Sequence, residues 1–230
     1  MSAAGRLFAV EGPDGVGRTT LVRALAEQLA AAGHAVTTVR LRGSPGLRGP
    51  LRSLQRRADI AERALFLLYA ADLADVYAHE IAPALAEGRV VLADRYVMTP
   101  VVRAEARGID PAWACDVLAF LPAPQRTLVL QAEAAVRLRR MLMRRRFLTP
   151  RESGLGATYR RDPQAMLVRY QHLMDELFAR RVDGQAAVGL DASAGPRDLL
   201  SAARRALSAD LPAPPKAGVP PGGLREGVKA

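Results

Sequence analysis

The stretch from Gly12 to Thr20 limits most strongly what this chain can fold into. It follows four apolar residues, Leu7 to Val10, and precedes a segment with leucine at every fourth position, as on one face of a helix. A glycine-rich turn between strand and helix lets backbone N–H groups surround phosphate oxygens, and the helix N-terminus adds partial positive charge. The spacing fits the P-loop pattern G-x-x-x-x-G-K-[ST], with Arg18 in place of lysine. We predict a phosphate-binding loop; a glycine-rich turn without a ligand is the alternative.

Within this loop, the side chains suggest distinct roles. Thr19 keeps the hydroxyl that a P-loop offers to Mg²⁺. Asp14 lies inside the loop, where it can approach the metal shell or an acceptor hydroxyl; a turn-stabilising aspartate is the alternative. The residues expected to contact ATP are Gly12, Asp14, Gly15, Val16, Gly17, Arg18, Thr19 and Thr20.

Five short apolar stretches predict strands, at residues 7–11, 35–41, 89–93, 126–130 and 186–190. Helical patterns separate them, and the longest, residues 60–87, predicts either two helices or one helix kinked before Pro83. This alternation predicts an α/β protein with a five-stranded parallel sheet and helices on both faces, the P-loop NTPase fold. The binding crevice of such a sheet lies beyond the carboxyl ends of its strands, where the P-loop, Arg42 and residues 94–96 would gather.

The C-terminal residues differ in composition from the rest of the chain. From residue 211 onward, five prolines and four glycines occur in 20 residues. Such a segment buries too little apolar surface to offset the entropy of ordering it. We therefore expect one kinase-type domain over residues 1–210 and a disordered tail over residues 211–230.

An acidic and a basic residue, Asp94 and Arg95, follow the apolar run Val90 to Leu92. A carboxylate at this strand end can meet Mg²⁺ together with the Thr19 hydroxyl, directly or through water. The guanidinium beside it can hold an acceptor phosphate with its forked donors. We expect Thr19 and Asp94 at a metal and Arg95 at the acceptor; a buried ion pair at the strand end is the alternative.

A cluster of arginines precedes a loop rich in glycine and proline at residues 147–159. We predict a mobile basic lid, because closure over donor phosphates would exclude water and add positive charge. A solvated helical face is the alternative. The arginines of the cluster are Arg137, Arg139, Arg140, Arg144, Arg145 and Arg146, of which Arg144 and Arg145 are the predicted catalytic members.

Composition narrows the classes of protein that fit. The net charge of +10 suits anionic substrates, nucleic acid or a membrane surface, but aromatic residues are sparse and not interleaved with arginine as in a nucleic-acid stacking platform. The sequence contains no run of 18 apolar residues, so we expect no membrane span. The N-terminal apolar run is too short for a signal peptide. Cys115 is the sole cysteine, which agrees with a reducing compartment. We expect a cytoplasmic protein without nucleic-acid or membrane partners.

Taken together, these motifs resemble the thymidylate kinase family of P-loop nucleoside monophosphate kinases over residues 5–208. Residues 11–15 resemble the family's E-G-x-D-G, and residues 94–96 match its D-R-[YH]. Residues 107–110 resemble its R-G-[IV]-D segment, and residues 150–154 resemble the lid of archaeal-type members. The combination of these motifs is much more specific than the P-loop alone.

The resemblance implies transfer of the γ-phosphate of ATP to dTMP, with Mg²⁺, in a homodimer. It implies that Arg18 and the lid arginines serve ATP, that Asp14 and Arg95 act near the acceptor, and that Phe66 stacks on the acceptor base. The acceptor-binding residues that it implies are Asp14, Arg42, Phe66, Tyr69, Arg95, Tyr96 and Arg103.

The chain departs from the family pattern in four places. The family's R-E-P-G-G loop is replaced over residues 40–45, and Asp72 and Val76 stand near the position of a family arginine in the third helix. Arg18 replaces the P-loop lysine, and Val102-Arg103 stand where the family carries a base-reading Tyr-Gln pair. Three alternatives to a dTMP kinase therefore stay open: a kinase of another or modified pyrimidine nucleotide, a nucleotide-binding protein with little catalysis, and a nucleic-acid-binding regulator.

Overall fold

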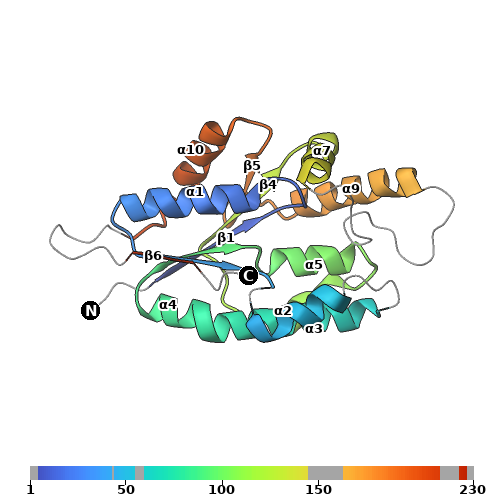
Figure 1. Cartoon of the computed structure of the whole chain (residues 1–230), viewed down its shortest axis with the longest axis horizontal. Coiled ribbons are helices and arrows are strands. Elements are labelled where there is room, and N and C mark those ends of the chain that lie inside the picture. Colours follow the sequence, from blue (N-terminus) through green and yellow to red (C-terminus); the bar gives the residue numbers. More distant parts are fainter. Residues whose placement is uncertain (1–4, 43, 55–59, 145–162, 213–222, 227–230) are drawn as a thin grey trace.

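A computed structural model of the chain describes residues 5–42, 44–54, 60–144, 163–212 and 223–226 (Figure 1). It is an α/β fold in which a parallel sheet lies between two layers of helices. The predicted fold class is confirmed. No helix within these ranges combines the length and the apolar character needed to cross a membrane.

The sheet has six strands in the order β5-β4-β1-β3-β2-β6, and all neighbours are parallel. The five predicted strands are present within one or two residues of their expected bounds. Because β1 lies between β4 and β3, the segment after β1 emerges at the middle of the sheet, where the P-loop was expected. The strands are β1 (Arg6–Glu11), β2 (Val36–Arg40), β3 (Val90–Asp94), β4 (Arg126–Gln131), β5 (Ala187–Asp191) and β6 (Leu224–Glu226).

The sixth strand corrects two predictions, a five-stranded sheet and disorder throughout the tail. β6 adds to β2, with Leu224 opposite Val36. Arg89 anchors this edge, because its Nη2 donates to the carbonyls of Val36 at 2.7 Å and Gly223 at 2.8 Å. Composition predicted disorder because it measures apolar burial, whereas an unpaired sheet edge offers main-chain hydrogen bonds that any sequence can use.

Helices cover both faces of the sheet (Figure 1): α1 and α10 lie on one face, and α2 to α5 lie on the other. The helices are α1 (Arg18–Ala31), α2 (Pro45–Leu54), α3 (Glu62–Val76), a π-helical turn (Tyr77–Ile81), α4 (Ala82–Ala86), α5 (Met98–Glu105), α6 (Pro111–Val117), α7 (Ala134–Arg144), α9 (Pro163–Ala179) and α10 (Pro196–Leu207).

The central strand β1 contributes side chains to the hydrophobic core on both faces of the sheet. Leu7 and Ala9 belong to the cluster under α3 and α5, whereas Phe8 and Val10 belong to the cluster under α1 and α10. This alternation follows from the two-residue period of a strand, and burial on both faces explains the continuous apolar run. The rigid centre of the sheet thus holds the P-loop at one end of β1.

Two local details refine the sequence predictions. The predicted irregularity before Pro83 is the π-helical turn between α3 and α4. Proline has no N–H to donate to the preceding turn, and a widened turn absorbs that loss. α2 begins at Pro45, and proline suits the first turn of a helix.

Candidate active site

The P-loop follows β1 and runs into α1 at a place where side chains would not fit. Gly12 and Gly15 have φ values of 133° and 80°, in the left-handed region that favours glycine. A Cβ on Gly12 would lie 2.6 Å from the Leu130 carbonyl oxygen, and a Cβ on Gly15 would lie 2.6 Å from the Arg137 carbonyl oxygen. β4 and α7 therefore approach the loop so closely that its path requires glycine.

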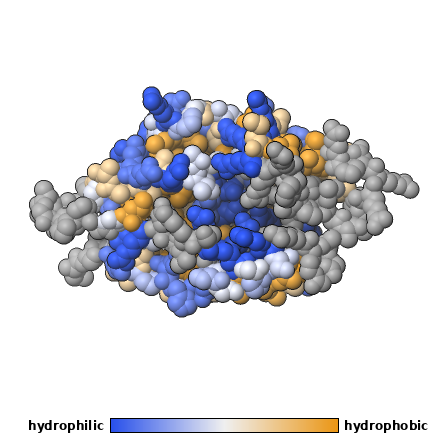
Figure 2. Space-filling model, viewed as in Figure 1, coloured by the Kyte–Doolittle hydropathy of each residue, from blue (hydrophilic) through white to orange (hydrophobic). Residues whose placement is uncertain are grey.

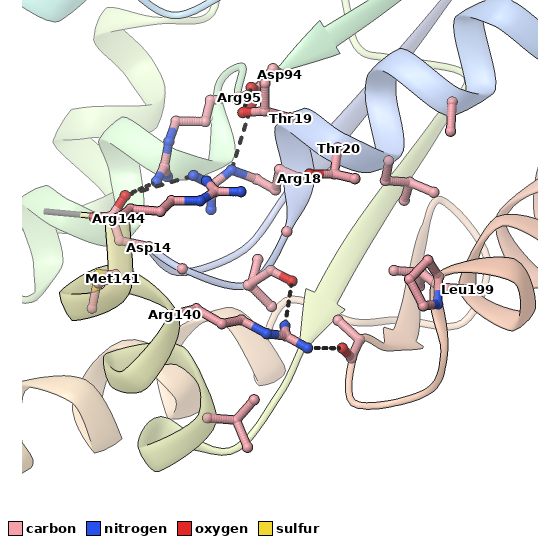
Figure 3. Close-up of a pocket in the computed structure, with 18 of the residues that line it drawn as sticks. Asp14, Arg18, Thr19, Thr20, Asp94, Arg95, Arg140, Met141, Arg144 and Leu199 are labelled. Atoms are coloured by element: carbon pink, nitrogen blue, oxygen red, sulfur yellow. Dashed lines mark hydrogen bonds and ion pairs between the residues drawn. The ribbon is translucent and has the colours of Figure 1, made fainter.

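A cavity of about 880 Å³ opens beside this loop (Figure 3). In the space-filling view, strongly hydrophilic side chains gather in the hollowed centre of the molecule's face (Figure 2). The volume is within the range of small-molecule sites. The predicted site residues that line it are Asp14, Gly15, Val16, Gly17, Arg18, Thr19, Thr20, Arg42, Asp94, Arg95 and Arg144.

Arg18 folds its guanidinium into the P-loop itself. Its Nη1 donates to the carbonyls of Gly12 and Pro13, and its Nε lies 3.3 Å from Asp94 Oδ1. The residue is only 9% exposed, so its charge lies beside the loop and is largely shielded from bulk solvent. The planar fork satisfies loop carbonyls and a carboxylate together, which a lysine ammonium would do from a single atom.

Thr19 and Asp94, the predicted metal ligands, touch each other at the mouth of the loop. Thr19 Oγ1 donates to Asp94 Oδ2 at 2.5 Å (Figure 3). A hydroxyl and a carboxylate are oxygen ligands of the kind that Mg²⁺ prefers, and Mg²⁺ usually completes its shell with water and substrate phosphates. The pair fits that requirement. Among the described residues, no cluster of three or more His, Cys, Asp and Glu side chains is placed to hold a metal.

Asp14 is the acidic centre of the site. Arg95 Nη2 donates to its Oδ1, Arg103 Nη2 donates to its Oδ2 at 2.9 Å, and Arg18 Nη2 lies 3.6 Å away. Burial alone would raise the pKa of Asp14, but these three guanidinium groups outweigh it and hold the pKa well below its usual range. Burial, with the neighbouring Arg18, lowers the pKa of Arg95 to about 9. The carboxylate is thus ionised and fixed at neutral pH.

Two arginines carry strained backbone at this site. Arg42 and Arg95 have φ values of 68° and 73°, and they are the non-glycine residues with positive φ in the described ranges. Such conformations cost about 1–3 kcal/mol and persist where surrounding structure enforces them. Both were predicted acceptor-binding residues. For Arg42, the enforcing group is Asp72 on α3, whose carboxylate accepts from the backbone N–H groups of Arg42 and Ser44.

A second, smaller pocket of about 20 Å³ adjoins the site between α3, α5 and α9. It brings together the predicted acceptor residues Phe66, Tyr69 and Arg103. It also contains Arg107, whose Nη1 lies 3.1 Å from Glu62 Oε1 and whose guanidinium lies over the Tyr170 ring at 5.8 Å. The sequence prediction did not assign Glu62 and Tyr170 to the site, because their placement depends on the packing of distant helices.

Tyr96 lies elsewhere, although it was predicted to bind the acceptor. Its side chain is 1% exposed in the hydrophobic core, and its hydroxyl donates to the Pro122 carbonyl at 3.1 Å. Its backbone N–H donates to Glu11 at 2.8 Å. Tyr96 lines neither pocket, so its position is that of a core residue that anchors the turn after β3.

The arginine cluster divides into distinct environments. Arg139, Arg140 and Arg144 line the large cavity. Arg137, predicted as part of a mobile lid, is instead fully buried and bound to Asp175 on α9. The long arginine side chain can extend from an amphipathic helix into the protein interior. The number of charged residues in the sequence does not show which arginine does so. Arg145 and the rest of the predicted lid loop lie outside the described residues.

Comparison with known proteins identifies the family. The family model described as thymidylate kinase matches residues 10–177. The chain belongs to the thymidylate kinase family. The prediction made from the sequence motifs is therefore confirmed, and with it the class of P-loop nucleoside monophosphate kinases.

Curated thymidylate kinases support the same assignment. A probable thymidylate kinase from Pyrococcus horikoshii is 34% identical over 146 residues, which cover 61% of this chain and 71% of the relative. The thymidylate kinase from Clavibacter sepedonicus is 38% identical over 154 residues, covering 62% and 71%. That from Leifsonia xyli subsp. xyli is 44% identical over 99 residues, covering 42% and 47%.

Proposed function

We propose that this protein transfers the γ-phosphate of ATP to dTMP and releases ADP and dTDP. Membership of the thymidylate kinase family supports phosphorylation of dTMP by ATP. The observation that carries the proposal is the position of Asp14 between the two pockets. Its carboxylate binds Arg95, which lines the large cavity, and Arg103, which lines the smaller pocket.

On the donor side, the P-loop and the start of α1 would bind the phosphates of ATP. Backbone N–H groups at a helix N-terminus favour anions, and Arg18 adds a full charge beside them. Arg140 and Arg144 line the same cavity from α7. Several guanidinium groups would therefore surround the region where negative charge accumulates during transfer.

On the acceptor side, Phe66 and Arg103 would contact the base, and Arg42 and Arg95 would hold the phosphate. Phe66 already has an aromatic neighbour, Trp113, with ring centroids 5.3 Å apart, so its ring is held in place. The smaller pocket encloses only about 20 Å³, so a pyrimidine enters when the lining side chains move outward. Side-chain rearrangement of this kind is common on binding.

In the proposed reaction, an oxygen of the acceptor phosphate attacks the γ-phosphorus. A new P–O bond forms as the bond to the β-γ bridging oxygen breaks, and ADP leaves with that oxygen and the bonding electrons. Such a transfer needs positioning and charge neutralisation more than a covalent nucleophile. Arg18, Arg95, Arg140 and Arg144 supply positive charge, and Asp14 keeps Arg95 and Arg103 in place.

Magnesium would be held by Thr19 and Asp94, with waters and ATP phosphates completing its shell. When bound, it neutralises charge on the phosphates and orients them. Asp94 binds Arg18 and Thr19 at once, so it would link the metal to the P-loop.

We also propose that the protein forms the homodimer that the resemblance to thymidylate kinases implies, and that it is located in the cytoplasm.

The choice of acceptor is tested by turnover with a panel of monophosphates. Mg·ATP is supplied with dTMP, dUMP, dCMP, AMP or GMP, and ADP release is measured by a coupled assay. We expect the highest kcat/KM with dTMP. A clear preference for AMP, GMP or dCMP would contradict the proposed substrate, while ADP release with none of the acceptors would contradict the proposed kinase activity.

A further inference from the structure

Arg137 has no role in the proposed chemistry, yet it is the largest fully buried side chain of the described residues. Every N–H group of its guanidinium has an acceptor. Nε donates to the Ala132 carbonyl at 3.2 Å, and Nη1 donates to the Asp14 carbonyl at 3.2 Å and to Gln171 Oε1 at 2.6 Å. Nη2 donates to the Gln171 carbonyl at 3.3 Å and to the Asp175 carboxylate at 2.7 Å.

These contacts reach the P-loop from the side that faces away from the large cavity. Arg137 does not line the large cavity, whereas Gly15 and Gly17 do. α7 also touches the loop directly, because a Cβ on Gly15 would meet the Arg137 carbonyl oxygen at 2.6 Å. One helical turn further, Arg140 Nη1 donates to the Val16 carbonyl at 3.3 Å and Nη2 to the Ala192 carbonyl at 3.2 Å (Figure 3).

The two carbonyls that α7 holds belong to peptides that end at glycine. A trans peptide is planar, and its C=O and N–H point in opposite directions. When the Asp14 carbonyl points to Arg137, the N–H of Gly15 therefore points away from Arg137; the same holds for the Val16 carbonyl and the N–H of Gly17. Glycine tolerates φ of either sign, so the covalent chain alone would let either peptide turn over.

We propose that Arg137 is a positioning residue that fixes the Asp14–Gly15 peptide so that the Gly15 N–H faces the donor phosphates. Arg140 differs, because it lines the cavity itself while its Nη1 donates to the Val16 carbonyl. The inference rests on the proposed use of the P-loop as the donor site. Arg137 would act on ATP binding by holding the loop and not by touching ATP, because its side chain does not line the cavity.

Isotope labelling tests this in the unmodified protein. Labelling aspartate carbonyl carbons with ¹³C and glycine nitrogens with ¹⁵N selects glycines that follow aspartate, which are Gly15 and Gly184. Gly184 lies in the turn before β5, away from the cavity, and serves as an internal control. We expect inorganic tripolyphosphate with Mg²⁺ to shift the Gly15 amide and to leave Gly184 unchanged. A Gly15 amide that does not respond while tripolyphosphate binds would overturn the proposal.

The variant Arg137→Lys tests the role of the guanidinium. Lysine keeps the charge beside Asp175 but cannot also span the carbonyls of Ala132 and Asp14. We expect tripolyphosphate affinity to fall about tenfold, the effect of losing roughly one hydrogen bond that fixes a phosphate donor, with dTMP affinity within about twofold of the wild type. The milder variant Asp175→Asn, which weakens the hold on Arg137, should act in the same direction.

The matched control is Arg126→Lys. Arg126 binds Asp210 Oδ2 at 2.6 Å and the Gln185 carbonyl, at the start of β4 and away from the P-loop end of the sheet. The Arg126→Lys variant should have a lower melting temperature than the wild type but should bind tripolyphosphate with the same affinity. If Arg137→Lys and Asp175→Asn bind tripolyphosphate as the wild type does, Arg137 is merely structural and the proposal is wrong. A wild type that binds tripolyphosphate but does not phosphorylate dTMP would contradict the proposed function alone.

Discussion

Replacing Asp14 with asparagine changes the residue that connects the two pockets, because its carboxylate binds both Arg95 and Arg103. The carboxylate accepts charge-assisted hydrogen bonds from Arg95 and Arg103 and lies 3.6 Å from Arg18. Asparagine keeps one acceptor oxygen, but its NH₂ group would face a guanidinium donor. Arg95, which is 7% exposed, would then be buried without a fully matched partner.

The expected loss of stability follows from these contacts. A hydrogen bond to a charged group contributes about 1.5–3 kcal/mol, and one of the two is lost while the other weakens. Asp14 is 27% exposed, so water screens part of the effect. We expect the free energy of unfolding to fall by about 2 kcal/mol at pH 7, measured by urea denaturation.

The pH dependence of this difference provides a sharper check. The folded-state pKa of Asp14 lies well below the unfolded value near 3.8, so its stabilisation is present above pH 3.8 and declines as the pH falls below it. At pH 3 the unfolded wild type takes up a proton that the native state does not, which removes about 1 kcal/mol. The variant lacks this group, so the difference between the two proteins should shrink at low pH.

Activity separates Asp14 from an ordinary ion-pair residue. We expect kcat/KM for dTMP to fall at least about 100-fold in Asp14→Asn, the scale of losing an electrostatic group at a reacting centre. The control is Glu105→Gln, because Glu105 binds Arg181, is 23% exposed and lies outside both pockets. A near-normal kcat/KM in Asp14→Asn, or an equal loss in Glu105→Gln, would refute the reasoning.

Three further predictions concern single features of the chain. In Arg18→Lys, we expect the rate of phosphoryl transfer to fall or to change little, because the loop carbonyls fit the guanidinium; a gain of about tenfold, or 1.4 kcal/mol, in a steady-state assay would contradict this. In Asp72→Asn, one acceptor of the Arg42 turn becomes a donor, so we expect a higher KM for dTMP with an unchanged KM for ATP, and equal shifts in both KM values would count against it. Truncation after Leu211 removes β6 and should lower the melting temperature by roughly 2–4 °C, equivalent to about 1 kcal/mol, with ATP affinity retained; an unchanged melting temperature would mean that β6 contributes nothing.

The parts of the fold predicted from the sequence depend on local patterns. The P-loop is a strand, a glycine-rich turn and a helix in direct succession, so its spacing carries nearly all the information. Asp94 and Arg95 were placed at the crevice because the carboxyl ends of parallel strands share one edge. β6 was missed because its pairing depends on the free edge of β2, far away in the sequence.

The features that were missed in the site depend on distant partners. Arg137 looks like its arginine neighbours on α7, and its partner Asp175 lies 38 residues further along the chain. Asp72 gave a signal, since it is a charged residue among the apolar positions of α3, but only the fold shows that it holds the turn at Arg42. Tyr96 belongs to a matched motif, yet it packs into the core, so a motif position does not by itself place a side chain in a pocket.

The transfer of labelled phosphate tests the central claim most directly. The wild-type protein is incubated with Mg²⁺, dTMP and ATP labelled with ³²P at the γ position, and the products are separated by chromatography. The account predicts that the label appears in dTDP, and that omission of dTMP abolishes its release from ATP. Label released as inorganic phosphate irrespective of dTMP, or no transfer despite measurable ATP binding, would contradict it.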